Sequence, residues 1–270
     1  MKNLLISSVT SIYKSKKFLE NFVQQLRSQT FFENTEIVLA DCNEDDDDFN
    51  LIEKFCKEPN VKYFKLNPDP GSYAAWNRAI DQTTTPYISN SDTDDVKAPW
   101  YFETMYNYME QHPEAEVVYG PVGKSSKPAA PFYEDFCNEL WQALDCNLST
   151  ILVDNSPHCM PTWRKSLHDE IGYFNERYVI KSDFEFWIKC LKKGKKINKT
   201  NLVMGNYLFN QESLSVHPDR RKRRDKEHRE IVEKHYKDLP PSVFDFYNSI
   251  LQRDAPIPSY RKMVIKQNRQ

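Results

Sequence analysis

Three carboxylates, Asp92, Asp94 and Asp95, stand almost side by side after the pair Tyr87-Ile88. Aromatic and β-branched residues favour a strand, so the carboxylates are predicted to follow a strand end at the edge of a sheet. Like charges this close raise one another's pKa unless a cation neutralises them. Mg²⁺ and Mn²⁺ prefer oxygen ligands and often bridge carboxylates to substrate phosphates. The Asp-x-Asp pattern is therefore a candidate divalent metal site, although a solvated acidic turn or a helix N-cap explains it equally well.

The segments before these carboxylates alternate between predicted strands and predicted helices. Apolar runs indicate strands at 4–9, 36–40, 61–66 and 87–88, and helical spacing indicates helices at 17–29, 49–57 and 73–81. This alternation predicts an α/β fold with a parallel sheet covered by helices. Ligands of such sheets bind at the carboxyl ends of the strands. Polar residues gather at three of those ends, namely Thr10 with Ser11, Asp41, and the stretch 92–95.

The rest of the chain is less regular. Further predicted elements are helices at 99–111, 165–171 and from Ser182 to about 193, and strands at 115–120 and 197–207. Residues 155–164 form an irregular stretch of aromatic and polar side chains. Residues 218–235 are highly charged and predict a solvated helix, and apolar spacing after 240 predicts a packed helix. The pattern at 132–144 is compatible with a helix.

Composition narrows the class of protein. A chain of 270 residues fits one large domain or one domain with an appendage. The 37 basic and 39 acidic residues nearly balance, so no nucleic-acid partner is expected, while the basic run 220–224 leaves open a peripheral contact with anionic lipid or acceptor. No stretch approaches the roughly 20 apolar residues of a membrane span. Six Cys without a Cys-x-x-Cys pair argue against structural zinc, and we expect a soluble, cytoplasmic protein.

Four stretches of the chain resemble the GT-A glycosyltransferases of family 2, which transfer a sugar from a nucleotide-activated donor. They are 8–13 with 18–20, 37–41, 71–80 with 87–95, and 163–165 with 171–176 and 182–187. The resemblance implies a Rossmann-like, mostly parallel sheet flanked by helices. It implies a GT-A domain at 1–217, with a donor half at about 1–98 and an acceptor half at about 99–217. A charged, helical C-terminal extension is expected at 218–270.

The same resemblance implies roles for individual side chains. The donor nucleotide is expected to contact Thr10, Ser11, Tyr13, Asp41, Asn77, Arg78, Asp92, Thr93 and Asp95. The metal, Mn²⁺ or Mg²⁺, is expected on Asp92 and Asp94, with His217 as a late ligand. The acceptor pocket is expected to use Trp163, Arg164 and Glu185. Asp183 is expected to act as the general base that takes the proton of the acceptor hydroxyl.

The implied reaction is metal-dependent, inverting transfer from a nucleotide-diphosphate sugar, with a UDP-sugar favoured, to a glycan or lipid-linked glycan in polysaccharide biosynthesis. Two alternatives remain open. A non-catalytic sugar-nucleotide or glycan-binding protein is compatible with departures from the family pattern at Ser11, Lys14, Ala74, Ser182 and Asn210. A nucleotidyltransferase would need a glycine-rich, basic phosphate loop after the first strand, and this N-terminal segment has none.

Overall fold

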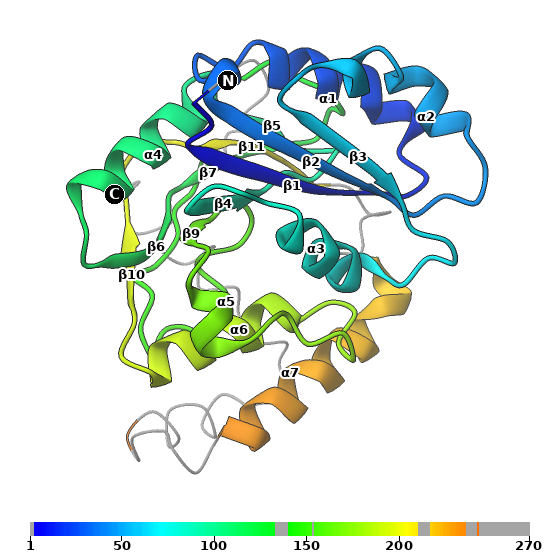
Figure 1. Cartoon of the computed structure of the whole chain (residues 1–270). Helices are drawn as coiled ribbons and strands as arrows, with labels where there is room; N and C mark the ends of the chain where they lie inside the picture. The colour runs from blue at the N-terminus through cyan, green and yellow to red at the C-terminus, as the bar shows by residue number, and fades with distance from the viewer. Residues whose placement is uncertain (1–2, 133–139, 153, 210–216, 236–241, 243–270) are drawn as a thin grey trace.

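A seven-stranded sheet forms the centre of the computed structural model, which describes residues 3–132, 140–152, 154–209, 217–235 and 242 (Figure 1). The strand order is β10-β6-β9-β4-β1-β2-β3. The strands are β1 (Ile6–Ile12), β2 (Thr35–Asp41), β3 (Val61–Lys65), β4 (Tyr87–Asn90), β6 (Ala115–Tyr119), β9 (Thr162–Arg164) and β10 (Lys196–Lys199). Neighbours pair in parallel except β9, which runs antiparallel to both β4 and β6. The predicted α/β fold with a mostly parallel sheet is confirmed.

Helices cover both faces of this sheet (Figure 1). One face packs against α1 (Lys16–Arg27), α2 (Asp47–Ile52), the short helices η1 (Phe32–Asn34) and η2 (Phe55–Lys57), and α4 (Tyr101–Gln111). The other face packs against α3 (Ser72–Asp81), α5 (Leu167–Ile171), α6 (Ser182–Lys192) and α7 (Arg221–His235), which follows η3 (Pro218–Arg220). Each layer buries its own apolar cluster, as two-sided burial of a parallel sheet requires.

A second, smaller sheet lies beside the first, with the order β5-β11-β7-β8. Its strands are β5 (Val96–Lys97), β11 (Gly205–Leu208), β7 (Val122–Ser125) and β8 (Leu140–Trp141). The approach of β11 to β5 requires a glycine, because a Cβ on Gly205 would lie 2.3 Å from the carbonyl oxygen of Val96. Most of this sheet escaped prediction, since strands of two to four residues carry too little alternation to recognise.

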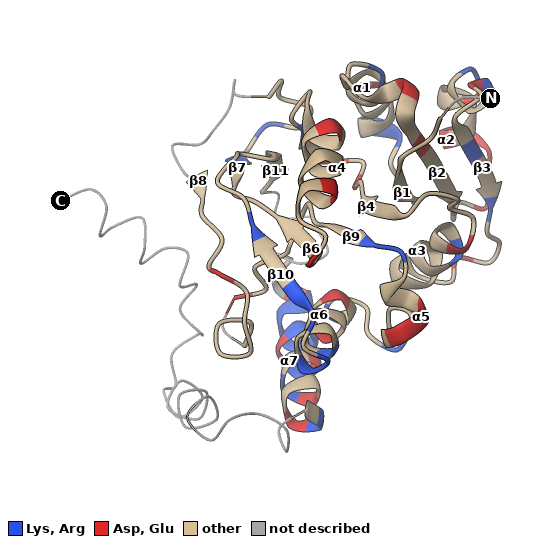
Figure 2. Ribbon diagram, turned by 60° about the vertical axis from the view of Figure 1, so that its left-hand side comes forward, with Lys and Arg blue, Asp and Glu red and all other residues tan. Residues whose placement is uncertain are grey.

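Helix α7 is more than a solvated appendage. Ile231 and Val232 of α7 are buried in the same apolar cluster as α6, and Glu227 of α7 is buried too. Figure 2 shows α7 lying beside α6 with charges of both signs along it. The prediction of a helix is therefore correct, but this helix packs one face against the domain and is not solvated on all sides. The helix predicted after 240 and the position of Asn210 lie outside the described residues.

Candidate active site

The loop after β4 carries the three carboxylates, and hydrogen bonds hold it to three other parts of the fold. The Ser91 hydroxyl lies 2.7 Å from that of Ser8 on β1. The Asn90 amide donates to Asp92 Oδ2 at 3.4 Å. Asp95 Oδ1 accepts the backbone N–H of Leu208 on β11 at 2.9 Å. As predicted, the acidic segment follows a strand end at the edge of the sheet, next to the start of β5.

Burial and mutual repulsion disfavour the charged forms of the carboxylates in this loop. Burial raises the pKa of Asp92 to about 7, and the neighbouring charge of Asp94 adds to the effect. Burial also raises the pKa of Asp94, and burial with both neighbouring carboxylates raises that of Asp95. The one basic group that lowers the pKa of both Asp92 and Asp95 is Lys97, whose ammonium is buried 3.8 Å above the Tyr101 ring and whose own pKa burial lowers to about 8.

The donor set of this loop suits a hard divalent cation. Asp92 and Asp94 offer half-buried carboxylate oxygens. A cation would favour the charged form of both, against the burial that raises the pKa of each and the charge of Asp94 that further raises that of Asp92. Within the part of the chain that the structure describes, no three His, Cys, Asp or Glu side chains form a ready-made metal cluster. His217 contacts Asp219, with 3.8 Å between Nδ1 and Oδ2. It therefore does not join the carboxylates in a three-residue cluster.

Asp183, the predicted base, lies in the first turn of α6 and is half-buried. Its Oδ1 accepts the Tyr73 hydroxyl at 2.8 Å, and its Oδ2 accepts the Asn155 amide at 2.6 Å. The charge of Asp183 contributes to the raised pKa of Asp92, and both charges raise the pKa of Tyr73, after burial in each case. The structure thus brings the predicted base within electrostatic range of Asp92, one of the predicted metal ligands.

The ends of β1 and β2 supply the predicted nucleotide contacts. Register places Ile12 beside Asp41, so the two strands end together. Thr10 is fully buried, and its hydroxyl has no partner among the described residues. Asp41 is buried and accepts the Tyr63 hydroxyl at 2.6 Å. Tyr13 is 47% exposed just after β1, where a ring is available to a ligand. Ser11 and Thr93 lie nearby in the fold and bond to Cys42 and Ser15 respectively.

Asn77 and Arg78 have internal partners. The Asn77 amide donates to the carbonyl of Phe174 at 2.9 Å and accepts the N–H of the same residue at 3.1 Å. Arg78 forms an ion pair with Glu176 at 2.9 Å. Both side chains therefore tie α3 to the loop before α6. Their predicted contact with a diphosphate stays a prediction.

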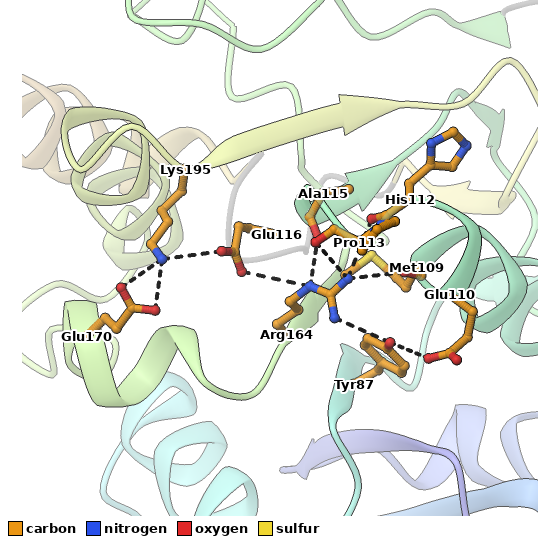
Figure 3. A network of polar contacts seen from close by, with 10 residues as sticks. All are labelled: Tyr87, Met109, Glu110, His112, Pro113, Ala115, Glu116, Arg164, Glu170 and Lys195. Carbon is orange, nitrogen blue, oxygen red and sulfur yellow. Dashed lines mark hydrogen bonds and ion pairs between the residues drawn. The ribbon is translucent and has the colours of Figure 1, made fainter.

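Trp163 and Arg164, the predicted acceptor residues, both have internal partners. The Trp163 ring is 1% exposed in the core, and its N–H donates to His168 at 2.9 Å. Arg164 pairs in register with Tyr87, at the end of β4 opposite to the acidic loop. Figure 3 shows its guanidinium among backbone carbonyls, including those of Ala115 at 2.8 Å and Met109 at 3.1 Å. Adjacent strand residues point to opposite faces, so Trp163 fills the core while Arg164, 22% exposed, binds backbone carbonyls on the other side. Both residues thus have a structural task, and their acceptor role stays a prediction.

Glu185 likewise has a structural task. It is 2% exposed and binds α7 through Lys234 at 2.6 Å, with His235 at 3.4 Å. In the opposite direction, the buried Glu227 of α7 accepts three backbone N–H groups just before α6, those of residues 179–181, at 3.0, 2.9 and 3.1 Å. These reciprocal contacts clamp the start of α6, which carries Asp183.

Three residues of this arrangement escaped sequence analysis: Tyr73, Asn155 and Glu227. Tyr73 was visible only as one aromatic residue of a helix, and Glu227 as one charge of a charged run. Their partners lie 110 and 46 to 48 positions away in the chain. No local pattern could reveal contacts at such a separation.

Comparison with known proteins places these observations in context. The family model described as glycosyl transferase family 2 matches residues 7–171. "Glycosyltransferase GlyG" of Streptococcus pneumoniae is 28% identical over 185 residues, covering 64% of this chain and 61% of that protein. The "UDP-Glc:alpha-D-GlcNAc-diphosphoundecaprenol beta-1,3-glucosyltransferase WfaP" of Escherichia coli is 26% identical over 225 residues, covering 78% and 80%.

Solved structures share the fold at low identity. TarS of S. aureus in complex with UDP-GlcNAc has a TM-score of 0.63 at 20% identity, over 78% of this chain and 60% of that chain. The mannosyltransferase PcManGT from Pyrobaculum calidifontis, in complex with GDP-Man and Mn²⁺, has a TM-score of 0.65 at 16% identity, over 95% and 69%. The match thus spans about three fifths of the length of GlyG and of the TarS chain. None of the helices in the described part of this chain combines the length and apolar character that a membrane crossing needs.

Proposed function

The chain belongs to glycosyl transferase family 2, and we propose that it transfers a sugar from a nucleotide-diphosphate sugar to a hydroxyl group of a glycan acceptor. One observation carries this proposal. A crowded acidic loop at a strand end and a hydrogen-bonded aspartate, Asp183, lie within electrostatic range of each other. Sugar transfer needs a group of each kind, one beside the departing diphosphate and one beside the incoming hydroxyl.

On the donor side, Asp92 and Asp94 would hold Mn²⁺ or Mg²⁺, which stabilises the negative charge of a departing diphosphate when bound. Thr10, Tyr13 and Asp41 border the adjoining strand ends, where we place the base and ribose. Asp95, fixed by the backbone of Leu208, holds the loop in shape. A UDP-sugar is the favoured donor, because WfaP is named for UDP-Glc and TarS was solved with UDP-GlcNAc.

On the acceptor side, Asp183 takes the proton of the acceptor hydroxyl as the new glycosidic bond forms. A hydroxyl that attacks the sugar from the face opposite to the diphosphate inverts the configuration, and we propose this outcome. The name of WfaP specifies a GlcNAc attached to a diphosphate lipid, so a lipid-linked glycan is the proposed acceptor class. This places the reaction in polysaccharide assembly, where a cytoplasmic site would meet nucleotide sugars.

The test separates binding from turnover. UDP is titrated calorimetrically with and without Mn²⁺, and UDP release from UDP-glucose is measured with a short-chain-lipid GlcNAc diphosphate as acceptor. Asp94→Asn is expected to weaken Mn²⁺-dependent UDP binding by at least about tenfold, while Asp183→Asn keeps UDP binding and loses about 100-fold or more in turnover. Asp47→Asn, which changes an exposed carboxylate that pairs with Lys16, is the matched control and should change neither.

Three results would contradict the proposal in different ways. UDP binding that ignores both Mn²⁺ and Asp94 would remove the metal assignment. Binding of UDP by a wild type that never turns over a donor would favour the non-catalytic alternative. GDP binding in place of UDP would change the donor class and leave the transferase proposal standing.

A further inference from the structure

Tyr73 is the one residue of the donor-side helix α3 that bonds to Asp183. It lies in the first turn of α3 and is 8% exposed. Its ring packs edge-on against Trp76, with 5.4 Å between centroids, and against Phe174 at 5.8 Å. These ring contacts would hold a phenylalanine equally well. The hydroxyl therefore needs a separate explanation.

The Tyr73 hydroxyl has two acceptors and a single hydrogen to give them. Oδ1 of Asp183 lies 2.8 Å away, and the carbonyl oxygen of Ile180 lies 3.0 Å away. Burial and the charge of Asp183 raise the pKa of Tyr73 well above its ordinary value, so the hydroxyl keeps its proton and acts as a donor. The hydrogen can thus point to either acceptor by rotation about the C–O bond alone.

We propose that Tyr73 is a positioning residue for Asp183, whose hydroxyl orients the ionised carboxylate and turns to the carbonyl of Ile180 when that carboxylate takes up a proton. This inference rests on the proposed function. In the step, the O–H bond of the acceptor breaks, its proton goes to the Asp183 carboxylate, and its oxygen bonds to the sugar. Tyr73 neither gains nor loses a proton, and the diphosphate leaves with the electron pair of the broken glycosyl bond.

Two further contacts fix the positions of the two groups that accept the Tyr73 hydrogen bond. The Asn155 amide holds the other carboxylate oxygen of Asp183 at 2.6 Å, which sets the plane of the group. Glu227 binds the N–H of Ile180 at 2.9 Å, which fixes the peptide segment that offers the alternative acceptor. Both acceptors of the Tyr73 hydroxyl therefore stay within reach throughout the reaction.

The test uses Tyr73→Phe, with Tyr87→Phe as the matched control. Tyr87 is also buried and also bonds to a carboxylate, that of Glu110, but at the opposite end of β4 (Figure 3). Tyr73→Phe is expected to lower kcat about tenfold while the KM for UDP-glucose stays within about twofold, because the donor is bound elsewhere. In a plot of kcat against pH, the acidic limb of Tyr73→Phe should move to higher pH. The reason is that a hydrogen bond to an ionised carboxylate favours the ionised form, and this variant has lost that bond. Tyr87→Phe should keep both kcat and profile.

A double-variant cycle then separates positioning from packing. If Tyr73 acts through the base, Tyr73→Phe should add no further loss in an Asp183→Asn background. Full additivity in the double variant, or an unchanged kcat and profile in Tyr73→Phe, would overturn the inference while the proposed function stands. If Asp183→Asn itself keeps wild-type turnover, the assigned base fails and the inference with it. Melting temperatures of all four variants check that each is folded.

Discussion

The buried glutamate of α6 offers a quantitative test of how α7 holds the site. Glu185 is expected to stabilise the fold rather than bind an acceptor. Burial alone would raise its pKa, but hydrogen bonds from His235, Lys234 and Asn175 lower the value from 4.5 to about 2. At ~1.4 kcal/mol per pH unit, this difference corresponds to about 3 kcal/mol of stability. Lys234 is 55% exposed, so solvent screens part of its attraction, and a loss of about 2–3 kcal/mol is expected for Glu185→Gln.

The sign of the pH dependence follows from the direction of the pKa change. Because the folded-state pKa of Glu185 lies below the unfolded value, the stabilisation is complete above about pH 4.5 and is lost as the pH falls toward 2. Urea unfolding of wild type and Glu185→Gln should therefore differ by about 2–3 kcal/mol at pH 7.5. The linkage relation predicts that the difference shrinks to roughly half at pH 3.5.

The control is Glu53→Gln, which removes an exposed carboxylate that pairs with Lys57 at 2.7 Å on the surface. That variant should leave the free energy of unfolding nearly unchanged, because solvent screens exposed pairs. A stability difference for Glu185→Gln that stays constant between pH 7.5 and 3.5 would refute the electrostatic account. An acceptor KM that rises in Glu185→Gln, with stability intact, would restore the acceptor role that the sequence predicted.

Two further variants probe the frame of the site. Glu227→Gln weakens the acceptor for the N–H groups of 179–181, and turnover should fall about tenfold while calorimetric UDP affinity stays the same, because the segment leads directly into Asp183. An equal loss of UDP affinity would show that α7 supports the whole domain instead. Arg164→Met leaves backbone carbonyls such as that of Met109 without their donor, and should cost about 2–3 kcal/mol in urea unfolding with donor and acceptor KM unchanged. A rise in acceptor KM without loss of stability would contradict its structural assignment.

The donor half could be predicted from sequence because its signals are local. Apolar runs define β1, β2 and β4, and parallel strands with helical connections must bring their carboxyl ends to one edge. That rule alone places Thr10, Asp41 and Asp92 near the same edge of the sheet, the one at the carboxyl ends of the strands. The helix predicted at 165–171 ends as α5 does, at Gly172, whose φ of 86° favours glycine.

The structural roles of residues after about 99 could not be predicted from the sequence, because they depend on contacts between residues far apart in the chain. β9 has three residues and pairs antiparallel between two parallel strands, so its Trp163 and Arg164 looked like a polar-aromatic loop. Whether an aromatic or a charged side chain binds a ligand or fills the interior depends on neighbours that the sequence does not identify. Arg164 shows the point, because its partners are carbonyls that any residue type could supply.

The family similarity covers the acidic loop but ends before the predicted base. The match ends at residue 171, whereas Asp183 and its partners Asn155 and Tyr73 straddle that limit. Asp183 is held on one side by α3, within the match, and on the other by Glu227 of α7, beyond it. A chain that kept only the matched segment would keep the acidic loop and lose the base together with half of its frame. Under the proposed function, the position of the base therefore depends on contacts that join α3, α6 and α7.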